Sequence, residues 1–222
     1  MMKRNCLTAL LTLLTLTCVY GQTTMDSCEC PRSPYAGMKA DTTFHLANGK
    51  SIVLCSYENP GSSPATFSEF LLSVCGQDSI IGFWGAVLTC RLKVNKDTLL
   101  VDQLENLPTG KNFKFQEAVW TTEKIYFVGQ QPVRQLSINR HIGKYTPDEI
   151  QVVLKNYETS KKGLDDSKLK IANELFIAAI SGSKKARHYF KEFKNKFGTL
   201  DGVLAEEYNE LAAMLALWDN KK

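Results

Sequence analysis

Histidine is scarce in this sequence, and familiar catalytic motifs are absent from it. Among 222 residues the histidines are His45, His141 and His188, which we predict to be surface or capping residues. The sequence contains no G-x-S-x-G elbow, no H-E-x-x-H pair, and no phosphate-binding, dinucleotide-binding or calcium-binding loop. We therefore predict no catalytic residue, no metal site and no cofactor.

A large excess of charge of one sign is also missing. The chain has 27 basic and 23 acidic residues, whereas a nucleic-acid-binding domain is typically strongly basic. After the N-terminal segment, the longest apolar stretch is residues 80–88, which is too short to cross a bilayer and is typical of a buried strand. These features predict no nucleic-acid partner and no transmembrane segment in the mature chain.

The first 21 residues have the three parts of a cleavable signal peptide. Lys3 and Arg4 precede an apolar stretch over residues 7–19, and cleavage is expected between Gly21 and Gln22. Removing 21 of the 222 residues leaves 201, with 25 basic and 23 acidic residues and a net charge of +2. We predict a secreted or periplasmic protein. An uncleaved anchor and a lipoprotein carrying lipid on Cys18 are the alternatives.

Five cysteines remain in the mature chain, and an oxidising compartment favours disulfide bonds between them. They are Cys28, Cys30, Cys55, Cys75 and Cys90. The number is odd, so at most two bridges form within one chain and one thiol is left over. Cys55 is a candidate partner for Cys28 or Cys30, and Cys75 is a candidate partner for Cys90. The Cys28-x-Cys30 spacing also occurs in metal sites, but further ligands are missing nearby, which favours disulfides.

The part before residue 141 is predicted to be an irregular cysteine-containing arm followed by a β-rich region. The arm covers residues 22–41, where Pro31, Pro34 and Gly37 interrupt any periodicity, and the β-rich region covers 42–140. A hairpin is expected over 42–56, with Asn48-Gly49 in a type I′ turn. Further strands are expected at 67–75, at 87–95 paired with 98–104, and in three segments between 113 and 138.

Residues 141–222 are predicted to form about four helices. The first begins at a capping box, Thr146 to Glu149, and the others cover residues 164–181, 184–197 and 202–219. In the second helix one apolar face is expected to point inward. Strands followed by helices define the α+β class, and the short connection near residue 141 favours one packed unit.

The predicted third helix carries a basic outer side. Its exposed cations are Lys184, Lys185, Arg187, Lys191 and Lys194. Such a helix can bind an anionic membrane or another polyanion. Alternatively, the acidic residues of the fourth helix partly neutralise this charge, if the two helices form an antiparallel hairpin.

Together these features predict an exported, non-catalytic protein. We expect a periplasmic or cell-surface binding or accessory module, with an envelope protein as its possible class of partner. Two other functions stay open. One is a hydrolase-type enzyme that uses the leftover cysteine with a histidine, and the other is a peripheral membrane or polyanion binder acting through the helix at 184–197.

Overall fold

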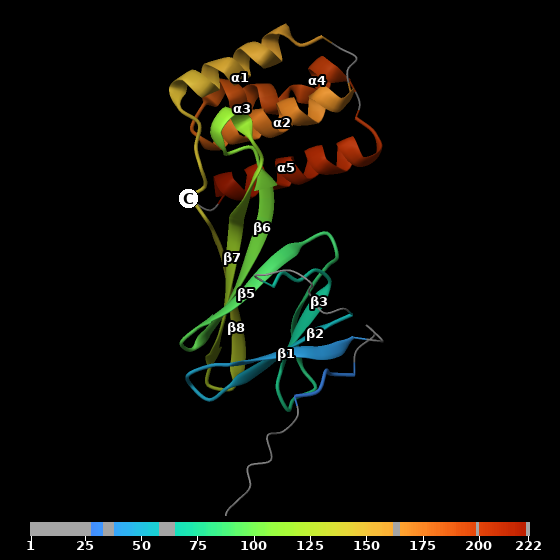
Figure 1. Cartoon of the computed structure of the whole chain (residues 1–222), viewed down its shortest axis with the longest axis vertical. Coiled ribbons are helices and arrows are strands. Elements are labelled where there is room, and N and C mark those ends of the chain that lie inside the picture. Colours follow the sequence, from blue (N-terminus) through green and yellow to red (C-terminus); the bar gives the residue numbers. More distant parts are fainter. Residues whose placement is uncertain (1–27, 33–37, 58–64, 162–164, 199, 221–222) are drawn as a thin grey trace, which may run out of the picture.

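A computed structural model gives the architecture of the chain. It describes residues 28–32, 38–57, 65–161, 165–198 and 200–220, so the expected signal peptide and its cleavage site lie outside the described residues. Two antiparallel sheets of four strands each are followed by helices gathered at one end of an elongated molecule (Figure 1). The α+β class is therefore confirmed.

The first sheet contains four strands in sequence order. They are β1 (Lys39–His45), β2 (Ser51–Ser56), β3 (Phe70–Val74) and β4 (Ile80–Trp84). The expected hairpin of β1 and β2 forms, but β1 begins at Lys39, inside the segment predicted to be irregular. The turn also differs from the predicted type. Leu46 pairs with Lys50 across three loop residues, and of Asn48 and Gly49 only Gly49 has a positive φ, 80°.

The second sheet is also a meander. Its strands are β5 (Thr89–Asn95), β6 (Thr98–Leu107), β7 (Gln116–Val128) and β8 (Gln131–Ile138). The predicted hairpin of β5 and β6 is confirmed, since Asn95 pairs with Thr98. The prediction of three further strands after it is wrong. A short 3-10 turn covers Lys111–Phe113, and residues 116–128 form one continuous strand.

The two sheets enclose one apolar core. Ile52, Leu54, Phe70 and Leu72 of the first sheet face Leu99, Val101 and Ile125 of the second, and all are almost completely buried. The expectation that residues 80–88 form a buried strand is only partly right. β4 is an edge strand on which Ile80 and Phe83 are exposed and only Trp84 is buried.

Arg134 of β8 joins the edge strand of the second sheet to β4, an edge strand of the first sheet. Its guanidinium forms an ion pair with Glu123 at 2.6 Å, donates to Ile81 O at 3.3 Å and lies 4.9 Å from the ring centre of Trp84. Gly82 lies directly beneath this guanidinium, where a Cβ atom would collide with it. The arginine therefore covers part of the free edge of β4, which would otherwise be available to another strand.

β6 and β7 form a long ribbon that runs from the sandwich into the helices (Figure 1). Leu99, Val101 and Ile125 belong to the sandwich core, whereas Leu107 and Trp120 belong to the helical core. Between these two sets the pairing passes from Gln103–Thr121 to Leu104–Val119, which makes Trp120 the extra residue of a β-bulge. Because a bulge bends and twists its strand, it suits the point where the ribbon leaves the sandwich.

Five helices follow. They are α1 (Pro147–Thr159), α2 (Asp165–Ile180), α3 (Lys184–Lys191), α4 (Phe193–Phe197) and α5 (Gly202–Asn220). The predicted capping box of α1 is confirmed, since Thr146 Oγ1 accepts from Glu149 N and Glu149 Oε2 accepts from Thr146 N at 2.8 Å. The helix predicted over 184–197 is interrupted at Glu192, where ψ is 7°. Four helices were expected, and this interruption produces the fifth.

α2 lies at the centre of the helical part and packs against α1, α3 and α5. Residues 171–180 are all buried, including Asn173 and Glu174, so the prediction of a single inward face is wrong. A helix surrounded by others must bury every side of its surface. Glu174 is consequently a carboxyl group held at 2% exposure, and burial raises its pKa.

Candidate functional site

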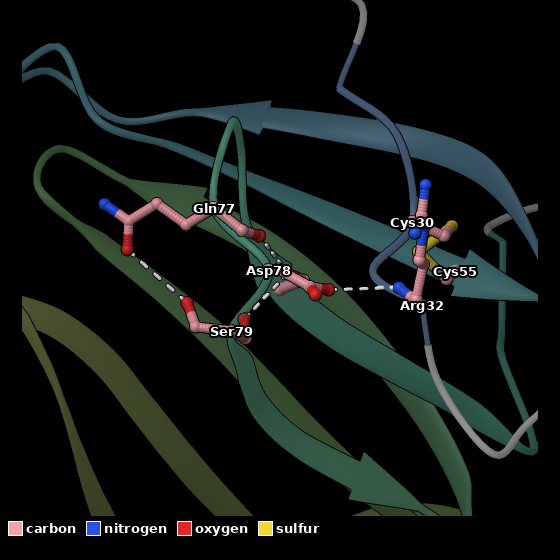
Figure 2. The surroundings of a disulfide bond; sticks show 7 residues. Cys30, Arg32, Cys55, Gln77, Asp78 and Ser79 are labelled. Atoms are coloured by element: carbon pink, nitrogen blue, oxygen red, sulfur yellow. Dashed lines mark hydrogen bonds between the residues drawn. A yellow bond between two sulfur atoms is a disulfide. The ribbon is translucent and has the colours of Figure 1, made fainter.

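Two disulfides fasten the N-terminal arm to the outer face of the first sheet. Cys30 bonds to Cys55 of β2, as Figure 2 shows, and Cys28 bonds to Cys75 just after β3. The expected link from the arm to Cys55 is therefore present with Cys30. The expected pairing of Cys75 with Cys90 is not formed. Together with Met38, the arm covers apolar side chains of β2 and β3, which buries this face as well.

An open hollow lies beside this arm. Glu29 and Arg32 line one side, and Gln77 and Asp78 line the other. Arg32 N donates to Asp78 Oδ1 at 3.0 Å, a hydrogen bond drawn in Figure 2. Because charges of both signs line it and it is wide open, the hollow has no evident preference for one ligand charge.

Cys90 is the free cysteine of the described chain, and it is completely buried in the sandwich core. Burial raises the pKa of its thiol to about 12, with a smaller contribution from the negative charges of Glu105, Glu123 and Asp102. His45, His141 and His188 are all exposed. A thiol without solvent access and without thiolate character is a poor nucleophile, so the Cys–His hydrolase hypothesis lacks its reactive pair.

Part of the predicted basic surface serves internal contacts. Lys185 forms an ion pair with Glu158 at 2.7 Å, and Arg187 forms one with Asp219 at 2.5 Å and donates to Ala179 O. Lys194 lies over the ring of Tyr208. Lys184 and Lys191 are exposed and form no ion pair with a described residue. Charge neutralisation by α5 is therefore seen at Asp219, and binding of a polyanion here stays a prediction.

A more selective cavity lies where the ribbon meets α2 and α5. This junction groove has a volume of about 340 Å³. Its floor is apolar and comes from Leu107 of β6 and from Leu211 and Met214 of α5, each at most 6% exposed. Phe115, which is 46% exposed, stands at its edge. Pockets with apolar floors at the junction of structural units are the usual sites of small ligands.

Carboxylates and amides surround that floor. Glu105 and Asn106 of β6 and Glu207 and Glu210 of α5 line the groove, together with Asn173 of α2. None of the described residues lining it is basic. Burial raises the pKa of Glu105, and the negative charge of Glu210 raises it further, while the hydrogen bond from Gln103 acts in the opposite direction. All the charged side chains that line the groove are therefore acidic.

Sequence reasoning did not find this groove. Glu207 and Glu210 were interpreted as partners of the basic helix, and Glu105 stood at the edge of a predicted strand. Their spacing of three residues on α5 does place both glutamates on one helix face. No pattern in the sequence near these residues, however, shows that β6 ends against this face of α5.

No helix in the described part of the chain combines the length and the apolar character needed to cross a membrane. Similarly, no group of three or more potential metal ligands converges among the described residues. Comparison of the chain with protein-family models, with curated proteins and with solved structures gives no match, so the functional argument rests on the geometry of this molecule.

Proposed function

We propose that the chain is an exported, non-catalytic binding module that holds a ligand in the junction groove. The observation that carries the proposal is the groove itself. It has a volume of about 340 Å³ and an apolar floor, and five polar side chains from three elements line it. Such a combination of shape and oriented polar groups is typical of binding sites.

Export is supported by two features of the chain. The first 21 residues follow the pattern of a signal peptide, and four of the remaining cysteines form the two disulfides, which persist in oxidising compartments. The absence of catalysis is supported by the position of the free thiol, since Cys90 is buried in the sandwich core and does not line the groove.

Export is tested by intact mass measurement of the protein recovered from each cell fraction. A periplasmic or secreted chain that begins at Gln22 and carries two disulfides supports the proposal. A chain in the cytoplasm that keeps its first 21 residues and has all seven cysteines reduced contradicts it.

Binding is tested by nuclear magnetic resonance on chain labelled with ¹³C in its methionine methyl groups. Met214 lies in the groove floor, and Met38 packs beside the disulfide-linked arm and provides an internal reference. We expect members of a set of cationic, neutral and anionic small organic compounds to shift the Met214 signal and leave Met38 unchanged. A set that leaves Met214 unmoved at millimolar concentration contradicts a binding role for the groove.

A further inference from the structure

The junction groove offers mainly hydrogen-bond acceptors to a ligand, and the exposed amide of Asn106 can donate as well as accept. Glu105, Glu207 and Glu210 contribute carboxylates, and none of them forms an ion pair with a described residue. Asn173 is 8% exposed and donates its amide Nδ2 to Leu169 O at 3.1 Å within α2. No described residue donates to the Oδ1 atom of Asn173. An ionised carboxylate and an amide oxygen both accept hydrogen bonds, so the complementary ligand is a donor.

The charges of the groove point to a positively charged donor. Glu105 is half-buried, and its burial, together with the negative charge of Glu210, disfavours its ionised form. A cation placed among these carboxylates would relieve that repulsion and form charge-assisted hydrogen bonds, which are stronger than neutral ones.

Resting on the proposed function, we propose that the junction groove binds an organic cation, in which an alkylammonium group meets the glutamates and a hydrocarbon body lies on the apolar floor. Leu107, Leu211 and Met214 form that floor. The exposed ring of Phe115 offers an additional cation–π contact at the edge.

The size of the groove limits the ligand. Its volume of about 340 Å³ lies at the lower end of the range of roughly 300–1,000 Å³ for small-molecule sites. It therefore accommodates a small amine or one long basic side chain of a partner polypeptide, and the two share the same alkylammonium chemistry.

Matched probes test the charge requirement through the Met214 methyl signal. The probes are n-hexylammonium, hexan-1-ol and hexanoate, which share one hydrocarbon body, and N-acetyl-lysine-methylamide, which carries the ammonium as a side chain. We expect n-hexylammonium to shift the Met214 signal at a concentration at least about tenfold lower than hexan-1-ol does, because it adds charge-assisted hydrogen bonds. Hexanoate should leave the signal in place. Saturation by the lysine derivative at lower concentration than n-hexylammonium would assign the ammonium to a basic polypeptide, and the reverse order would assign it to a free amine.

Variants locate the charge that is recognised. The combination Glu105→Gln with Glu210→Gln should weaken n-hexylammonium binding at least about tenfold, because it removes two charges while keeping the side-chain shapes. Glu206→Gln is the matched control, since Glu206 is exposed on the same helix and does not line the groove. Its affinity should equal that of the parent chain. Unchanged Met38 signals in all three chains verify that each is folded.

The outcomes separate this inference from the binding function. If hexan-1-ol or hexanoate shifts Met214 as readily as n-hexylammonium, the groove binds ligands but the requirement for a cation is wrong. Equal losses of affinity in the control and the double variant also contradict the inference. If no probe shifts Met214, and the wider compound set fails as well, the proposed function fails with it.

Discussion

The indole rings of Trp120 and Trp218 stack at 5.7 Å between their centres, with 20° between their planes. Trp120 comes from the bulge of β7 and Trp218 from the end of α5, so this contact joins the ribbon to the helices. Arg140 continues the stack, since its guanidinium lies 4.2 Å from the ring centre of Trp218 and donates to the carbonyl oxygen of that residue at 2.7 Å.

Trp120→Ala should destabilise the chain strongly. Trp120 is 1% exposed and also contacts Phe176 of α2, so its removal leaves a cavity between β7, α2 and α5. Truncation of a buried aromatic side chain costs about 3–5 kcal/mol, and urea unfolding measures it. Val128→Ala on the same strand is the control, because Val128 is 63% exposed and its truncation should change the free energy of unfolding by less than about 0.5 kcal/mol. Equal changes in the free energy of unfolding for the two substitutions would show that the packing of Trp120 does not stabilise the fold more than an exposed side chain does.

The two disulfides should each stabilise the folded chain. They close loops with sequence separations of 47 and 25 residues, and such cross-links typically contribute about 2–4 kcal/mol by restricting the unfolded chain. We expect Cys28→Ala with Cys75→Ala, and Cys30→Ala with Cys55→Ala, to lower the free energy of unfolding by amounts of this size. Denaturant titration under non-reducing conditions measures both. A double variant as stable as the parent chain would mean that the corresponding bridge does not form.

Glu174→Gln should stabilise the protein at neutral and alkaline pH. Burial raises the pKa of Glu174, while Lys170 and a hydrogen bond with Asn156 lower it in part. A carboxyl whose folded pKa exceeds its unfolded pKa favours folding fully below the unfolded value, and this contribution is lost as the pH rises through the folded value. The neutral amide keeps the shape and removes the buried charge.

The expected gain from Glu174→Gln at pH 8 is about 1–3 kcal/mol, the usual cost of a buried polar atom without a full set of partners. It should shrink towards pH 4. Thermal unfolding between pH 4 and pH 8 provides the measurement, with Glu206→Gln as a control at an exposed position of α5. A variant less stable than the parent at pH 8 would contradict this account of Glu174.

Cys90 should be unreactive in the folded protein. Its thiol is 0% exposed, and its pKa is raised to about 12, so thiolate and access are both lacking near neutral pH. In the mature chain that begins at Gln22, a thiol-specific colour reagent should find one reactive group in denaturant without reductant, and essentially none in the folded state over the same time. Rapid labelling of folded chain would place Cys90 at the surface and reopen the Cys–His hydrolase hypothesis.

Local features of this fold could be predicted, since they depend on neighbouring residues. The capping box at Thr146 and Glu149 and the hairpin of β5 and β6 are both determined by the residues that form them. The turn at Gly49 shows that local sequence does not always determine the turn type. Asn-Gly favours a two-residue loop, but the pairing of Leu46 with Lys50 leaves a three-residue loop.

The candidate site could not be predicted in this way. Glu105 and Glu210 are far apart in the sequence and meet only because the ribbon extends beyond the sandwich to α5. The bulge at Trp120 and the partner of Cys75 likewise depend on the packing of whole elements, and the residues nearby give no signal of either.

The most direct test of the binding function is an intermolecular nuclear Overhauser measurement on the parent chain with n-hexylammonium. We predict contacts between the alkyl protons of the probe and the methyl group of Met214, and their loss when Glu105→Gln and Glu210→Gln are combined. Contacts with other surfaces and none with Met214, at a concentration that saturates binding, would contradict the assignment of the junction groove as the ligand site.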